Sequence, residues 1–135
     1  MKKSLLVLIS LLFVSNLQAN STLEEAQLKA NMREMLRSME MIQKGGFYAK
    51  PAMMKKGVVN LKEAMKLLDN NHAKRYLPKE EKYAEKFAAK RAKMIIMYAE
   101  DIPISLDEEN MDDALEDYSQ ILRQCSSCHL RIRKW

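Results

Sequence analysis

Residues that favour strands and turns are scarce in this chain. Its 135 residues include only three Gly, three Pro and one Trp, and aromatic residues make up 7%. After residue 20 the only Val residues are Val58 and Val59, and the only Thr is Thr22. Ala, Leu, Met, Glu and Lys, which are strong helix formers, dominate instead. The composition therefore predicts an all-α fold, and the length predicts a single domain.

The N-terminal apolar stretch is too short to span a membrane. It runs from Leu5 to Val14, follows Lys2 and Lys3, and is interrupted only by Ser10. A bilayer requires about 20 apolar residues. Ala19 suits cleavage by a signal peptidase, although Leu17, two residues before it, is larger than usual at that place. These features predict a signal peptide over residues 1–19, export to the periplasm, and a mature domain over residues 20–135 without a membrane span.

The charge is mild in total but uneven along the chain. The formal net charge is +5, and it falls to +3 without Lys2 and Lys3, which is too little to indicate nucleic-acid binding. One acidic block comprises Asp107, Glu108, Glu109, Asp112, Asp113, Glu116 and Asp117. A basic stretch comprises Lys74, Arg75, Lys79, Lys82, Lys86, Lys90, Arg91 and Lys93. Solvated helix faces account for both, and a patch that steers a charged redox partner is the alternative.

Helix-breaking residues divide the mature chain into four predicted helices. The three breaks are placed at Gly45-Gly46 with Pro51, from Asn70-Asn71 to Pro78, and at Pro103. Ser105 followed by Glu108 predicts a capping box for the last helix.

Within each piece, apolar residues recur at intervals of three and four. The first two stripes are Leu28, Met32, Met35, Met39, Ile42 and Met54, Val58, Leu61, Met65, Leu68. The last two are Tyr83, Phe87, Met94, Met97 and Met111, Leu115, Tyr118, Leu122, Cys125, His129, Ile132. Such spacing places one apolar stripe on each helix. Four amphipathic helices with short connections predict an antiparallel four-helix bundle.

The pentapeptide Cys125-Ser126-Ser127-Cys128-His129 matches C-x-x-C-H, the signature of covalent haem attachment. Two thiols can add across the two vinyl groups of a porphyrin, and residues at i and i+3 of a helix face the same way. His129 then supplies the proximal ligand to the iron. The motif therefore predicts one covalent haem c, held on the C-terminal helix.

Other uses of the two cysteines are less consistent with the rest of the chain. A disulfide or a thioredoxin-like redox pair suits an exported protein, but a thioredoxin-like motif needs strands around it. A structural zinc site needs four ligands, and the mature chain has two Cys and two His. A chance match would leave a haem-free helical module for metal binding or protein interaction. Export, the helical rhythm and the place of the motif in an apolar stripe favour haem.

The motif lies so near the C-terminus that any second axial ligand must come from upstream. In this respect the chain resembles the cytochrome c-prime family, monohaem four-helix bundles with C-x-x-C-H on the last helix. The run Cys128–Arg133 is similar to that family's motif, in which an Arg follows the ligand His by four; here it is Arg133, which suits a haem propionate. The run Leu28–Met32 is similar to the helix that supplies an axial Met in a b-type four-helix relative.

Met32 is accordingly the candidate distal ligand of the iron, because thioether sulfur ligates haem and raises its potential. The chain has eleven Met, however, so core packing is the alternative use, and Met35 and Met39 share the stripe and could compete as ligands. Phe87, Met94 and Tyr118 are candidates to line the haem or to fill the core. A copper site built from Met32, Met35, Met39 and Met41 is the least favoured reading.

No acid, base or nucleophile arrangement for catalysis is evident, so the chain is not expected to be an enzyme. We expect a periplasmic monohaem c-type cytochrome that carries single electrons between redox partner proteins. The resemblance also implies an alternative, a five-coordinate cytochrome c-prime that binds or buffers nitric oxide or carbon monoxide. It allows a homodimer, which no apolar patch in the sequence demands.

Overall fold

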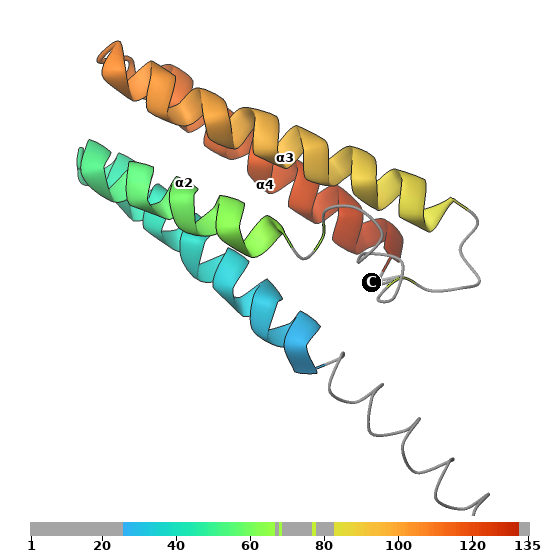
Figure 1. Cartoon of the computed structure of the whole chain (residues 1–135). Helices are drawn as coiled ribbons and strands as arrows, with labels where there is room; N and C mark the ends of the chain where they lie inside the picture. The colour runs from blue at the N-terminus through green and yellow to red at the C-terminus, as the bar shows by residue number, and fades with distance from the viewer. Residues whose placement is uncertain (1–25, 67, 69–76, 78–82, 133–135) are drawn as a thin grey trace, which may run out of the picture. The chain divides into compact units, whose positions relative to one another are not determined.

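The computed structural model describes residues 26–66, 68, 77 and 83–132. Residues 26–47 are helical and are called the first helix below; α2 spans Pro51–Met65, α3 spans Ala84–Asp107 and α4 spans Met111–Ile132 (Figure 1). The described residues contain four helices and no strand, so the all-α prediction is confirmed for them. The chain divides into two compact units, residues 1–30 and 31–135, and the second holds the core. The predicted signal peptide lies outside the described residues.

The turn between the first helix and α2 lies later than predicted. Gly45 and Gly46 continue the first helix, and the break falls at residues 48–50, where Ala49 has a φ of 49°. A side chain at Gly45 would meet Met54, since a Cβ there would lie 2.7 Å from the Met54 backbone nitrogen. The lack of a side chain at Gly45 therefore allows the first helix to approach α2 closely. Pro51 begins α2 at a position where a backbone N–H would have no partner within the helix.

Pro103 does not end a helix, contrary to the prediction. It lies inside α3, which continues to Asp107. An interior Pro costs a helix about 3 kcal/mol. Ile102 and Leu106, on either side of it, are buried in the core, and each such burial contributes roughly 1.5–3 kcal/mol. Packing of this end of α3 thus offsets the local cost of the proline.

The last helix is capped by Asn110, not by the predicted Ser105. The backbone N–H of Asp113 donates to Asn110 Oδ1 at 3.2 Å, and Asn110 Nδ2 donates to Asp113 Oδ2 at 2.6 Å. Ser105 is still inside α3, and its hydroxyl donates to the Asp101 carbonyl at 3.3 Å. Asn is as good an N-cap as Ser, so the start of α4 at Met111 follows from local chemistry that the capping-box pattern missed.

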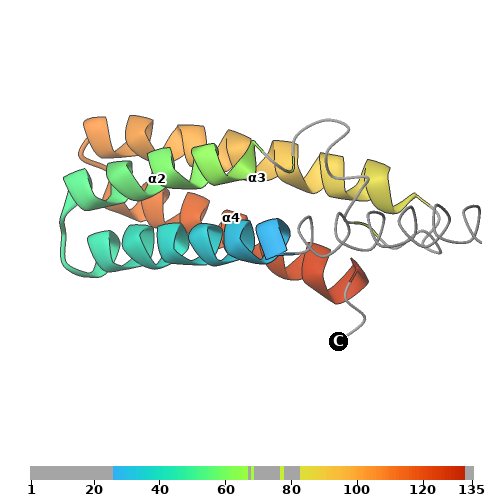
Figure 2. The ribbon, with the colours of Figure 1, turned by 60° about the horizontal axis from the view of Figure 1, so that its bottom comes forward.

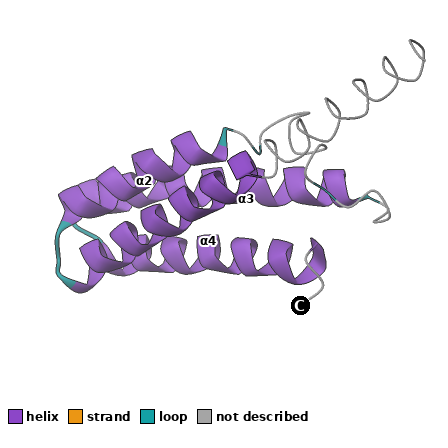
Figure 3. Ribbon diagram, turned by 90° about the horizontal axis from the view of Figure 1, so that it is seen from below, coloured by secondary structure: helices purple, strands orange, loops and turns teal. Residues whose placement is uncertain are grey.

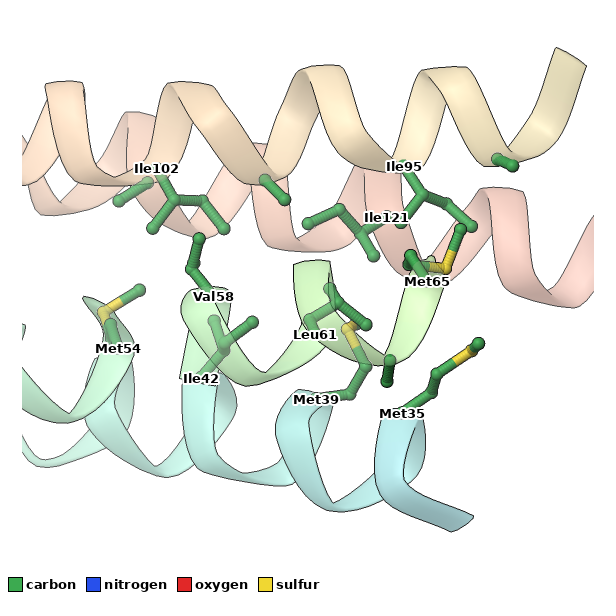
Figure 4. Close-up of a cluster of buried hydrophobic side chains, with 14 of the residues drawn as sticks. Met35, Met39, Ile42, Met54, Val58, Leu61, Met65, Ile95, Ile102 and Ile121 are labelled. Atoms are coloured by element: carbon green, nitrogen blue, oxygen red, sulfur yellow. The ribbon is translucent and has the colours of Figure 1, made fainter. Parts of the chain in front are cut away.

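One apolar core draws on all four helices, which lie alongside one another (Figures 2 and 3). The first two predicted stripes are confirmed where they are deepest. Their buried members are Met35, Met39 and Ile42 on the first helix and Met54, Val58, Leu61 and Met65 on α2 (Figure 4). Leu28, Met32 and Leu68 are only partly buried.

The predicted stripe of α3 is wrong. Tyr83 is 64% exposed and Met97 is 47% exposed, while Phe87 and Met94 are only partly buried. The residues that α3 buries are Ala84, Ala92, Ile95, Ala99, Ile102 and Leu106. Half of them are Ala, which lets neighbouring helices approach closely, so the buried face follows small residues as well as large ones.

The stripe of α4 is right in part. Ala114, Ile121 and Gln124 are the buried residues of α4, and Leu122, predicted to be in the core, is 50% exposed. The other predicted members that pack against the core from its edge are Met111, Leu115, Tyr118 and Cys125. The buried face of α4 is therefore centred beside the predicted stripe, and Cys125 lies at the edge of that face.

A second close approach of the first helix to α2 is at Gly57. A Cβ at this position would lie 2.7 Å from Ile42 Cγ1, 2.9 Å from the Ile42 backbone nitrogen and 3.0 Å from the Ser38 carbonyl oxygen. Two of these three atoms belong to the backbone, which cannot turn aside as a side chain can. Gly57 therefore sets how near the two helices pack.

We expect Gly57→Ala to destabilise the protein even though Ala is the better helix former. Overpacking costs about 1–3 kcal/mol, whereas Ala gains roughly 1 kcal/mol over Gly in a helix. Urea denaturation followed by circular dichroism measures the difference. Gly46→Ala is the matched control, because its Cβ would meet only the flexible side chain of Leu115. A Gly57→Ala protein as stable as Gly46→Ala would show that the approach is not tight.

Candidate functional site

The last turns of α4 carry the C-x-x-C-H motif on unbroken helix. Cys125, Cys128 and His129 are all partly buried, and both thiols are free of disulfides. Positions i and i+3 of a helix are neighbours on its surface, so the two cysteines share a side of α4. Cys125 packs against the margin of the core. The motif thus sits where the apolar interior meets the surface.

Both thiols are held in the neutral form by their surroundings. Burial raises the pKa of Cys125 to about 11, and the neighbouring Cys128 adds to the effect. Burial also raises the pKa of Cys128, and the positive charge of Arg91 partly opposes it. A dithiol redox pair depends on a thiolate with a lowered pKa. The shifts run in the opposite direction, which disfavours the thioredoxin-like use of the two cysteines.

Arg91 of α3 lies beside the motif; the sequence placed it in the basic stretch but did not predict it as a site residue. Its Nη1 donates to the side-chain oxygen of buried Gln124 at 2.5 Å. Its guanidinium lies 4.8 Å from the centre of the Phe87 ring, and that of Arg131 lies 4.5 Å from the same ring. Two cations therefore stack on one aromatic side chain, a favourable arrangement. In the sequence, this cluster is indicated only by the spacing of Phe87 and Arg91, which lie four residues apart on one predicted helix.

One polar atom of this cluster is buried without a partner. Arg91 Nε has no hydrogen-bond partner among the described residues. A buried N–H left unpaired costs about 1–3 kcal/mol, more on a charged group. Such a donor, whose guanidinium lies near the Cys128 thiol, suits a site for an anionic ligand. The donor set thus fits a c-type haem, which needs two thiols, an axial ligand and countercharge for its propionates.

The other residues predicted for the site are only partly brought together. Burial raises the pKa of the Tyr118 phenol, and the charge of the nearby Cys125 adds to the rise. Phe87 is part of the arginine cluster, and Met94 is partly buried on α3. Arg133, the predicted propionate partner, lies outside the described residues.

Met32 and Met35 differ in their relation to the core. Met35 is buried at the end of the cluster that also holds Met65, Ile95 and Ile121 (Figure 4). Met32 packs on the margin of the core, as Cys125 does. Met32 thus lies about one helical turn before buried Met35, and Cys125 lies about one turn after buried Ile121, so each stands one turn away from a buried residue of its own helix.

One groove of the described residues lies away from the motif. It has a volume of about 670 Å³ between α2 and α3, and its lining residues are Val59, Lys62, Glu63, Met65, Lys66, Ala92, Lys93, Ile96, Met97 and Glu100. None of them belongs to α4. Because thioether attachment would tie a haem to Cys125 and Cys128, we take the motif and not the groove as the candidate site.

None of the described helices combines the length and the apolar character that crossing a lipid bilayer requires.

Comparison with known proteins adds no relative. No protein-family model, no curated protein and no solved structure matches the chain.

Proposed function

We propose that the chain is a periplasmic monohaem c-type cytochrome that carries single electrons. The observation that supports this most is the motif Cys125-x-x-Cys128-His129, with free thiols on one side of α4 and Cys125 packed against the core. A bound haem would supply the change between ferric and ferrous iron. The protein's part is to hold the haem, shield it and set its potential.

Each residue of the site has a definite part in this proposal. Cys125 and Cys128 would hold the porphyrin through thioethers, and His129 would be the proximal ligand of the iron. Arg91 and Arg131 offer positive charge to an anionic porphyrin, and Phe87 keeps their guanidinium groups in place. Met32 is the proposed distal ligand, because it lies at the margin of the core as Cys125 does.

An antiparallel arrangement of the four helices belongs to the same proposal. The contacts between the first helix and α2 support it, since they join residues in reverse order along the two helices. Asn31 Nδ2 donates to the Ala64 carbonyl at 2.6 Å, and the approaches of Gly57 to Ile42 and of Gly45 to Met54 follow in turn. In such a bundle the first helix and α4 can present ligands to opposite faces of one porphyrin.

Haem retention after denaturation tests the proposed function. Protein made together with haem-attachment machinery should keep its colour on the polypeptide in acidified organic solvent, because thioethers do not release haem. Its mass should exceed that of the bare chain by one haem, and a pyridine haemochrome assay should give one haem per chain. Complete extraction of the colour, or the mass of a bare chain with a disulfide, would refute the proposal.

A further inference from the structure

Charge is separated along the pair of helices that carries the site. Residues 100–117, the end of α3 and the start of α4, contain nine Asp or Glu and no Lys or Arg. Residues 83–93 and 118–132, which include the motif, contain six Lys or Arg and one acidic residue, Glu85. The second compact unit is therefore acidic at one end of α3–α4 and basic at the other.

Three lysines form an exposed row on the basic end. Lys86, Lys90 and Lys93 follow one another on α3 at intervals of four and three, and we call them the lysine row. They surround a shallow recess whose floor includes Ala89 and Met94. Like charges at i and i+4 destabilise a helix slightly, so the row is not explained by the stability of α3.

Three lysines elsewhere in the described residues are paired with a carboxylate, whereas none of the lysine row is. Lys55 pairs with Asp107, Lys62 with Glu100 at 2.7 Å, and Lys66 with Glu63. No ion pair joins Lys86, Lys90 or Lys93 to a carboxylate of the described chain. The uncompensated charge gives this face a positive potential that extends into the solvent by about a Debye length, ~10 Å at 0.1 M salt.

The lysine row lies at the same end of α3 as the residues that pack beside the motif. The hydrogen bond from Arg91 to Gln124 and the stacking of Arg131 on Phe87 place residues 87–91 of α3 alongside residues 124–131 of α4. Lys86 and Lys90 each directly precede one of the two α3 residues of these contacts, so the row lies about 100° around α3 from the side that contacts α4. A molecule bound over the row would therefore stand at the end of α3–α4 that carries the motif.

We propose that the lysine row is the docking surface for a redox partner protein with an acidic face. This inference rests on the proposed function and adds the chemistry of the partner. The positive potential would steer such a partner toward the haem-bearing end and orient it there, which can raise association rates by 10-fold to 1,000-fold at low salt. The acidic end of α3–α4 would repel the same partner and so discourage the reverse orientation.

Electron transfer to small charged oxidants measures the potential at this surface. One electron passes from the ferrous holoprotein to hexacyanoferrate(III), giving the ferric protein and hexacyanoferrate(II), with no bond made or broken. Lys86→Glu/Lys90→Glu/Lys93→Glu should slow this reaction about tenfold at low ionic strength. It should accelerate oxidation by the cation tris(phenanthroline)cobalt(III), and both effects should fade in 0.5 M salt.

The matched control changes the same charge at another place. Lys44→Glu/Lys50→Glu/Lys56→Glu alters three exposed lysines at or near the turn between the first helix and α2. It should leave both rates nearly unchanged. A deca-glutamate peptide should slow oxidation of the wild type and of this control by hexacyanoferrate, but not that of the lysine-row variant. Equal effects of the two triple variants would refute the proposal, since net charge alone would then explain them.

Two further measurements separate the possible failures. A haemochrome assay on each variant shows whether haem is present: a chain without haem refutes the proposed function, while a haem-bearing chain whose rates ignore the lysine row refutes only the docking surface. Co-sedimentation with phosphatidylglycerol vesicles tests a lipid surface. Vesicle binding that depends on the row, with unchanged oxidation rates, would also overturn a protein partner.

Discussion

The double variant Cys125→Ala/Cys128→Ala should carry no covalent haem at all. With both thiols gone, no thioether can form, and acidified organic solvent should remove all colour from the polypeptide. Its mass should equal that of the bare chain. Each single variant should keep one thioether and yield less holoprotein. His129→Ala should lose the proximal ligand, which a changed haem spectrum would report.

Ser126→Ala is the control for this experiment. Ser126 lies within the motif but is exposed, and its hydroxyl donates only to the Leu122 carbonyl of the same helix at 2.9 Å. Its loss should leave covalent haem at the wild-type level. Colour that stays on the polypeptide of the double variant would mean that the haem is attached elsewhere, and the role proposed for α4 would fail.

Met32→Ala should convert the iron from six-coordinate to five-coordinate. The wild-type ferric protein should be low-spin, with the weak far-red band of a methionine–iron bond, and should bind carbon monoxide slowly because the gas must displace sulfur. The variant should be high-spin and should bind the gas rapidly. Its potential should fall by on the order of 100 mV, since thioether ligation favours ferrous iron and axial ligands set haem potentials over roughly 0.8 V.

Met35→Ala is the control, and the structure gives it a different expected result. Met35 is buried in the core, so truncation should cost roughly 2–5 kcal/mol of stability and leave the haem spectrum as in the wild type. Denaturation and absorption spectra of the two variants measure this contrast. A change of spin state in Met35→Ala alone would make Met35 the ligand. A wild type that is already high-spin and binds carbon monoxide rapidly would favour the gas-binding alternative.

The sequence by itself determined the helical class and the buried faces of the first helix and α2, and it contains the C-x-x-C-H motif of the candidate site. Helix propensity and a period of three and four residues are local properties, and they suffice where large apolar residues such as Met39, Ile42 and Leu61 dominate a face. The motif Cys125-x-x-Cys128-His129 is likewise contiguous, so its match to C-x-x-C-H can be recognised without a fold.

Only the tertiary structure decided which residues α3 and α4 bury and where α3 ends. Pro103 is tolerated because Ile102 and Leu106 pack into the core around it, and Ala99 is buried because a neighbouring helix comes close. The cluster of Arg91, Phe87 and Arg131 could not be read from the sequence either. Its members come from two helices, and only the packing of α3 on α4 brings two guanidinium groups onto one ring, beside the thiols of the motif.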